Sequence, residues 1–145
     1  MSAATFSITG TTPAAPGTAV VGAAITWLDR YDVVRIAADL AGATGGPLDV
    51  YLQTSPNGGA NWYDYAHFTQ LAAGAAATRF FVVPTPSNTI SAVGKDLVPA
   101  LAANTCVGGH PGERMRVVAV AGALTTAGAV ATVYVECIQF DRTTR

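Results

Sequence analysis

Charged residues are scarce in this sequence. Only 12% of its 145 residues are Asp, Glu, Lys or Arg, against about 25% in an average soluble domain. Lysine occurs once, at Lys95, and no basic run exists, so direct binding to nucleic acid is not expected. A domain with so few charges must expose neutral or apolar surface, which often belongs to an interface. We therefore expect a protein that works inside an assembly; a compact protein with a merely neutral surface is the simpler alternative.

Cysteine and long apolar runs are scarce too. Cys106 and Cys137 are too few for a disulfide framework, although the sequence leaves open whether they are bridged. Reduced thiols fit synthesis in a cytosol. No stretch approaches the roughly 20 apolar residues of a membrane span, so no membrane partner is expected. Residues 1–10 lack the charged start and continuous apolar block of a secretory signal.

Groups that could form a catalytic site are few. The sequence has two histidines, His67 and His110. Cys106 and His110 are close in sequence, but they lie in a segment rich in Gly and Pro where Glu113 is the only nearby carboxylate. A nucleophile needs a base and an orienting group within reach, and a reactive thiol needs an electropositive setting. We therefore expect no catalytic residue and no enzyme.

Metal ligands are not arranged in a recognisable pattern either. Zinc needs three or four ligands, and the spacing of the two histidines and two cysteines matches no zinc site. The carboxylates of Asp29, Asp32 and Asp64 could offer oxygen to calcium, but Arg30 interrupts the first pair, and the run of alternating oxygens of a calcium loop is missing. No metal and no cofactor is expected.

What the sequence does contain is strand-like alternation of apolar and polar residues. Strands are predicted at 5–9, 18–28, 33–40, 48–54, 62–68, 79–83, 113–121 and 129–140. About eight strands separated by turn signals, with little helix, predict an all-β protein. The expected architecture is an antiparallel β-sandwich, jelly-roll-like, with an immunoglobulin-like sandwich as the competitor.

The chain divides into an N-terminal arm at 1–16 and a single β-sandwich domain at 17–145. The arm is either disordered or laid across a neighbour, although its weak alternation at 5–9 also fits a short edge strand. Within the domain, 85–112 is a long loop with no sustained period. Loops of this length are often functional, so it is a candidate contact surface; an ordered crossover of a Greek-key topology is the alternative.

A hairpin at 48–68, LDVYLQTSPNGGANWYDYAHF, is the clearest local signal. Pro56 presets one backbone angle, and Asn57-Gly58 is a strong hairpin dipeptide. Trp62 is expected to anchor the core just past the turn. Strand alternation would place Tyr63 and Tyr65 on one face, either as a platform for a sugar ring or as a cross-strand aromatic pair with Tyr51.

The turn resembles the Asp-box of sialidases and other β-proteins. Its residues are Ser55, Asn57, Gly59 and Trp62, with Asn57 in place of the motif's Asp and Asn61 in place of its Thr. The resemblance implies that the short polar side chains bond to the loop backbone and that the Trp packs beneath it. We expect these four residues to be a structural turn; a ligand site is the alternative.

The run VYLQTSPNGGANWYDYAHF (50–68), preceded by DRYDVVRIAADLAGATGGPLD (29–49), resembles small virion proteins of tailed bacteriophages. The whole chain is most similar to a capsid decoration, or cement, protein. The resemblance implies a structural virion protein on the outer capsid surface that stabilises contacts between major capsid protein capsomers. It also implies self-association as a homodimer, with a homotrimer as second choice.

Two regions are expected to face the capsid. They are the arm, through Phe6 and Ile8, and the long loop, through Leu97 and Leu101. The alternative function is a phage tail-associated or lectin-like carbohydrate-binding jelly-roll module, in which Tyr63 and Tyr65 contact a glycan.

Overall fold

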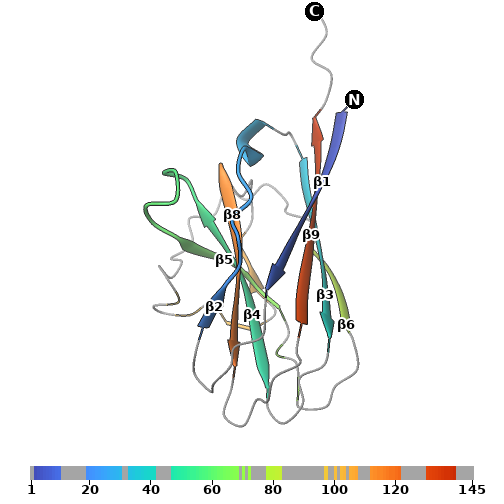
Figure 1. Cartoon of the computed structure of the whole chain (residues 1–145), viewed down its shortest axis with the longest axis vertical. Coiled ribbons are helices and arrows are strands. Elements are labelled where there is room, and N and C mark those ends of the chain that lie inside the picture. The colour runs from blue at the N-terminus through green and yellow to red at the C-terminus, as the bar shows by residue number, and fades with distance from the viewer. Residues whose placement is uncertain are drawn as a thin grey trace, which may run out of the picture.

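The computed structural model places the chain in two antiparallel β-sheets (Figure 1). The structure describes residues 2–10, 19–30, 33–41, 47–68, 70, 72, 78–82, 97, 100, 102–103, 105–107, 112–121 and 130–139. Apart from the single 3-10 turn η1 (Leu28–Arg30), these residues form strands and loops and contain no α-helix. No helix among them is long and apolar enough to cross a membrane. The predicted all-β, antiparallel class is confirmed.

The strands are divided four and five between the sheets. The first sheet has the order β1 (Ser2–Gly10), β9 (Val130–Gln139), β3 (Val33–Ala41), β6 (Thr78–Val82). The second has the order β2 (Ala19–Val21), β8 (Arg114–Ala121), β4 (Leu48–Ser55), β5 (Tyr63–His67), β7 (Thr105–Cys106). Because β2 and β7 hold only three and two residues, the described part of the chain does not by itself fix the predicted number of about eight strands.

Strand pairs are nested along the chain. β1 pairs with β9, β2 with β8, β3 with β6, and β4 with β5. The chain therefore changes sheet after each of its first three strands, reverses in the β4–β5 hairpin, and returns in the opposite order. This nesting brings both ends of the described chain, β1 and β9, side by side (Figure 1).

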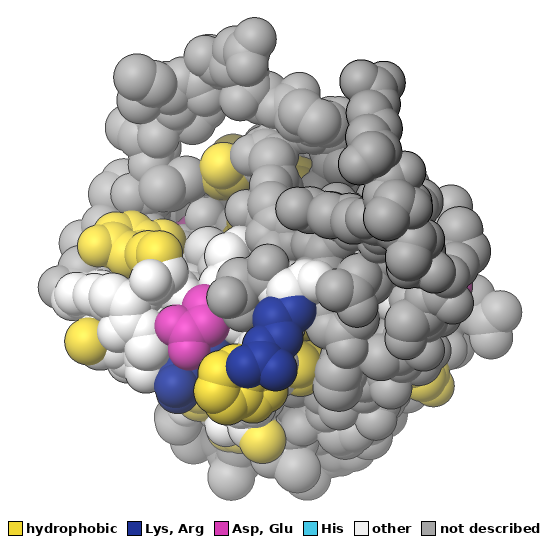
Figure 2. Space-filling model, turned by 90° about the horizontal axis from the view of Figure 1, so that it is seen from above, with side chains coloured by type: hydrophobic (Ala, Val, Ile, Leu, Met, Phe, Trp, Pro, Cys, Tyr) yellow, Lys and Arg dark blue, Asp and Glu magenta, His cyan; other side chains and the backbone are white. Residues whose placement is uncertain are grey.

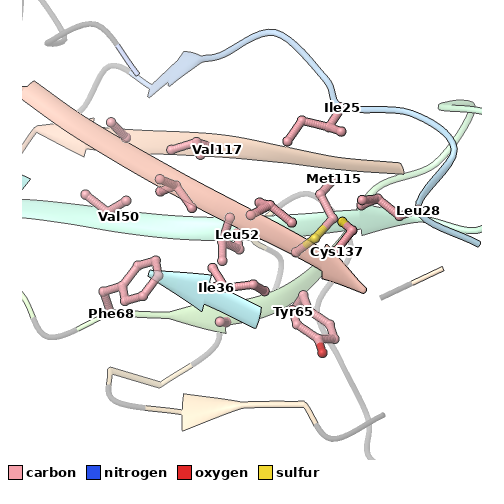
Figure 3. Close-up of a cluster of buried hydrophobic side chains, with 14 of the residues drawn as sticks. Ile25, Leu28, Ile36, Val50, Leu52, Tyr65, Phe68, Met115, Val117 and Cys137 are labelled. Atoms are coloured by element: carbon pink, nitrogen blue, oxygen red, sulfur yellow. The ribbon is translucent and has the colours of Figure 1, made fainter. Parts of the chain in front are cut away.

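Side chains from both sheets form one hydrophobic core (Figure 3). In β9, Val133, Val135 and Cys137 have no exposed surface, whereas Tyr134 between them is 41% exposed, as strand alternation predicts. Across the core lie buried side chains of the second sheet: Val50, Leu52, Met115, Val117 and Ala119. Burial of these aliphatic groups, at about 25 cal/mol per Å² of apolar surface, is the main force that holds the sheets together.

Residues 2–10, expected as part of an N-terminal arm, form the edge strand β1. All nine pair with β9, as the edge-strand alternative predicts. Contact of this segment with a neighbour stays a prediction. The weak alternation at 5–9 pointed to this strand. Positions 6 and 8 stand opposite Val135 and Val133, and directly opposite residues share a face of the sheet. Residues 11–18 lie outside the described residues, so the boundary of the arm stays a prediction.

The strand predicted at 18–28 is much shorter than expected. β2 ends at Val21, Ile25 makes one bridge with Met115, and η1 follows. Between them Trp27 has a φ of 70°, in the left-handed region that a regular strand does not contain. The apolar run was long enough for a strand, but regular pairing with β8 ends at Val21, and the left-handed φ of Trp27 is incompatible with a strand through 28.

The predicted loop 85–112 contains one short strand. Thr105 and Cys106 form β7, which pairs with His67 and Ala66 of β5. Leu97 is also described, with a φ of 65°. Most of the remaining loop, including Leu101, lies outside the described residues, so the contact-surface and crossover interpretations both stay predictions.

Candidate functional site

The turn between β4 and β5 is closed by its own side chains. Ser55 Oγ donates a hydrogen bond to Asn57 Oδ1 at 3.0 Å and accepts one from the N–H of Gly59 at 2.9 Å. Asn57 Oδ1 also accepts from the N–H of Asn61 at 3.0 Å. These bonds start from the polar side chains of the Asp-box-like motif, and they fix the path of the backbone. In the structure, the polar side chains of the motif therefore stabilise the turn.

Two glycines allow this turn to reverse. Gly58 and Gly59 have φ values of 72° and 95°, where a residue with a side chain is strained. A Cβ added to Gly58 would meet no atom within 4 Å, so its backbone angle alone calls for glycine. The predicted turn at Asn57-Gly58 thus depends both on hydrogen bonds from side chains and on the backbone conformation that glycine permits.

Trp62 leaves the turn half-buried and does not join the hydrophobic core. Its ring lies against Arg116, whose Cζ is 4.3 Å from the ring centroid. Arg116 alternates along β8 with Met115 and Val117, which face the core, so the contact lies on the outer face of the five-stranded sheet. The expectation that Trp62 anchors the core is therefore wrong, because Trp62 alternates onto the same outer face as Asp64, which bonds to Gln53.

A buried chain of hydrogen bonds crosses this outer face. Arg116 Nε donates to Gln53 Oε1 at 2.8 Å, and Gln53 Nε2 donates to Asp64 Oδ1 at 2.9 Å. Gln53 and Asp64 are each 1% exposed. Within the described residues, no buried side-chain nitrogen or oxygen lacks a partner. A satisfied polar network of this kind makes the local structure rigid and unique.

A β-bulge in β5 includes Tyr65, one of the two tyrosines that were candidates for binding sugar. The register passes from Leu52 opposite Ala66 to Gln53 opposite Asp64, so Tyr65 is an extra residue in β5. Tyr65 turns into the core and is 2% exposed, whereas Tyr63 is half-buried. Tyr63 stands opposite Thr54, and Thr54 stands opposite the buried Met115, so the two tyrosines share a face as predicted. That face is the core side of the sheet, so they do not form an exposed platform for a sugar. Burial raises the pKa of the Tyr65 hydroxyl, and the nearby Cys106 raises it further.

His67 is held on the outer face by two neighbours. Its Nε2 lies 3.1 Å from Asp49 Oδ1, and its ring stacks on that of Tyr51 with 3.9 Å between centroids. Tyr51 thus pairs with His67 and not with a tyrosine. Gln70 Nε2 donates to the second oxygen of Asp49 at 2.8 Å. Burial raises the pKa of Tyr51, with smaller contributions from the Asp49 and Asp64 carboxylates.

Both cysteines are free thiols, so the structure has no bridge between Cys106 and Cys137. Cys106 is exposed, yet partial burial of its sulfur raises the pKa of the thiol. A raised pKa lowers the thiolate fraction at neutral pH, which is the opposite of what a nucleophile needs. His110, the other half of that candidate pair, lies outside the described residues.

Metal-binding candidates are not gathered in the part of the chain that is described: no group of three or more His, Cys, Asp or Glu side chains lies close enough to hold a metal ion. Asp32 and the side chain of Asp29 lie outside the described residues, and Asp64 accepts the bond from Gln53.

Of the four predicted capsid contacts, Leu97 alone has a side chain that the structure describes. Leu97 is half-buried and lines a pocket of about 190 Å³ on the outer face of the five-stranded sheet. Its partners there are Ala19, Val21, Gln53, Arg116 and Val118. Positions 6 and 8 belong to β1, and Leu101 is outside the described residues. Partner contact through these four residues stays a prediction.

An exposed aromatic residue that the sequence did not single out lies at one end of the molecule. Trp27 is 56% exposed, and Arg30 Cζ lies 4.4 Å from its ring centroid. Glu113 and Arg114 form a partly exposed ion pair in the adjoining segment, with 3.2 Å between Oε1 and Nε. Figure 2 looks onto this end, where basic, acidic and apolar side chains lie together. We call Trp27, Arg30, Glu113 and Arg114 the end cluster.

The backbone around Trp27 is fixed on both sides. Ile25 exchanges two hydrogen bonds with Met115, at 2.8 and 3.1 Å, and Leu28 N–H donates to the carbonyl of Glu113 at 3.0 Å. The side chains of Ile25 and Leu28 are buried. The left-handed φ of Trp27 directs its side chain outward between them. The sequence signal for this was indirect: an aromatic residue directly before the polar corner at 29–32.

In comparisons with protein-family models, curated proteins and solved structures, none matches this chain. Its function is therefore argued from its own residues and from the resemblance carried by 29–68.

Proposed function

We propose that the protein is a structural component of a tailed-phage virion. In this proposal it binds the outer surface of the capsid and stabilises the contacts between capsomers of the major capsid protein. The resemblance of 29–68 to small virion proteins supports this function, as does the low content of charged residues. The described β-structure, with a rigid outer face and an exposed end cluster, is compatible with a protein that acts by surface contact.

The nested strand pairing supports a jelly roll as the scaffold. A jelly roll distributes eight strands over two sheets in two Greek keys. With the two-residue β7 set aside, the sheets read β1-β9-β3-β6 and β2-β8-β4-β5, so the first strand pairs with the last. An immunoglobulin-like sandwich would place its first two strands in one sheet. Here β1 and β2 lie in different sheets, which favours the jelly roll.

The observation that carries the binding proposal is the conformation of Trp27. A non-glycine residue in the left-handed region costs on the order of 1–3 kcal/mol and persists only where surrounding contacts enforce it. Here the contacts of Ile25 and Leu28 do so, and the result is a Trp side chain held in solvent. Trp and Arg are the residues most enriched at binding hot spots, and Arg30 lies directly on the ring.

A preorganised anchor of this kind loses little side-chain freedom on binding, which favours affinity. If the protein binds only the assembled capsid, each bound copy shifts the equilibrium toward that state. Repetition of the contact over many equivalent sites adds to this effect.

Composition of the virion tests the proposal. We expect the chain in purified particles of the phage that encodes it, in a copy number near that of the major capsid protein. Its absence from particles, or a copy number of only a few per particle as in a tail component, would contradict a capsid role.

A pair of matched substitutions tests the anchor. Trp27→Ala is expected to weaken binding to capsids that lack the protein by about 10-fold or more, as hot-spot truncations do. Tyr134→Ala, on the four-stranded sheet, removes another exposed aromatic side chain and is expected to leave binding unchanged. Equal binding by Trp27→Ala and the unchanged chain would show that the end cluster is not the contact.

A further inference from the structure

The two sheets have four edge strands, and one of them differs from the others. β2 and β7 are three and two residues long, and β6 has five residues that include Arg79. Short length and charge are two ways in which proteins keep sheet edges from pairing with other chains. β1 has nine residues, SAATFSITG, with no charged residue and no proline. Among the four edge strands, β1 is therefore the one that is neither short nor charged.

One side of β1 is free of strands among the described residues. β9 pairs with β1 along its full length, and β1 is the outermost strand of its sheet in the strand order. β8, which β1 also approaches, is already paired on both sides, with β2 and β4. In an antiparallel ladder, alternate residues of an edge strand direct their N–H and C=O groups away from the neighbour. β1 thus presents a row of backbone donors and acceptors.

We infer that β1 is a self-association surface, on which β1 of a second copy of this chain pairs antiparallel to form one continuous sheet across the dimer. A strand that pairs antiparallel with its own copy does so about a two-fold axis, which closes the assembly at two copies. The order across the interface is β6-β3-β9-β1 followed by β1-β9-β3-β6 of the second copy.

The register of β1 suits this pairing. Positions 5, 7 and 9 stand opposite Glu136, Tyr134 and Thr132 and belong to the outer face of the sheet. They are Thr, Ser and Thr, which form favourable cross-strand pairs with one another. Positions 6 and 8 belong to the face of the buried Val135 and Val133. When the two copies of β1 pair about the two-fold axis, the core-side face of one sheet continues into the core-side face of the other.

This inference goes beyond capsid binding and does not depend on it. A chain that dimerises but binds no capsid refutes only the proposed function. A chain that binds capsids as a monomer refutes only the pairing of β1.

Sedimentation equilibrium with three chains tests the pairing. The unchanged chain is expected to be a dimer. Ser7→Lys places a charge on the β1 edge and is expected to weaken dimerisation by about 10-fold or more, because charged edge residues block pairing. Val21→Lys places the same charge on β2, the edge of the other sheet, at a side chain that is already 50% exposed. It is expected to leave the dimer intact.

Amide hydrogen exchange on the unchanged chain gives a second readout that does not depend on any variant folding. Raising the protein concentration is expected to protect amides of residues 2–10 selectively. A monomer at every concentration, a trimer, dimer formation without protection of 2–10, or a dimer that Val21→Lys dissociates and Ser7→Lys does not, would each overturn the inference.

Discussion

Arg116 and Trp62 join the hairpin turn to the middle of the five-stranded sheet. The guanidinium carbon lies 4.3 Å from the centroid of the indole, and the same side chain donates to the buried Gln53. The contact spans two elements that are more than fifty residues apart in sequence. It gives the turn a fixed orientation relative to β8, which the turn's internal hydrogen bonds cannot supply.

Substitution of Arg116 is expected to destabilise the fold more than substitution of Arg30. Both stack on a Trp at nearly the same distance, 4.3 and 4.4 Å. Arg116→Ala also deprives buried Gln53 of a donor, so we expect a loss of about 1–3 kcal/mol in the free energy of unfolding. Arg30→Ala breaks an exposed contact worth about 0.5–1 kcal/mol. Urea denaturation of both variants measures the difference; equal losses would show that the bond to Gln53 contributes nothing.

Two substitutions of Asn57 are expected to have opposite effects on stability. Asn57 Oδ1 accepts hydrogen bonds from Ser55 Oγ and from the N–H of Asn61. Asn57→Ala removes both and is expected to cost about 0.5–2 kcal/mol, the range for lost caps of this type. Asn57→Asp keeps the acceptor and strengthens it with charge, so its stability at neutral pH is expected to equal or exceed that of the unchanged chain. Thermal unfolding of the two variants checks this; a destabilised Asp variant would contradict the observed bonding.

Alkaline pH is expected to destabilise the protein through Cys137. Burial, with a smaller effect of Glu136, raises the pKa of this thiol from 9.0 to about 11. The folded state therefore holds its proton at pH values where the unfolded chain has released it. The stabilising contribution is complete below pH 9 and is lost as the pH rises through 11, by as much as about 3 kcal/mol.

Cys137→Val removes this titration and keeps an apolar side chain in the core, so the fall in stability between pH 9 and 11 is expected to flatten. Cys106→Ala is the control, since Cys106 is exposed and a smaller part of the fall depends on it. Denaturation curves recorded across this pH range give the answer. If the Val variant loses stability as steeply as the unchanged chain, Cys137 is not the group responsible.

Alternation of apolar and polar residues in the sequence predicted those strands that have one face buried in the core. At 113–121 and 129–140 it separated core residues from outward ones correctly, as Met115 and Val117 against Arg116 show. The signal is strong there because a regular strand with one buried face must repeat with period two. The hairpin at 48–68 was predicted for the same reason, together with the backbone needs of Asn57-Gly58.

Three features had no period-two signal. Tyr65 is the extra residue of a bulge, whose position depends on the pairing of β5 with β4. Trp27 has its left-handed φ between Ile25 and Leu28, which bond to the backbone of Met115 and Glu113, some ninety residues further along the chain. Gln53 is buried on the face opposite the core, where Leu97 lies in the adjoining pocket. Each depends on long-range contacts that a local pattern cannot report.

The burial of Tyr65 distinguishes it from Tyr63, the other tyrosine of β5. The two lie on the same face of β5, since Tyr63 stands opposite Thr54 and Thr54 opposite the buried Met115, but they differ in burial. In the structure Tyr65 is 2% exposed within the core, so Tyr65→Ala is expected to cost about 3–5 kcal/mol in the free energy of unfolding. Tyr63→Ala truncates a half-buried side chain outside the core, and we expect a loss of about 1 kcal/mol or less. Urea denaturation measures both, and similar losses for the two variants would mean that Tyr65 is no more deeply buried than Tyr63.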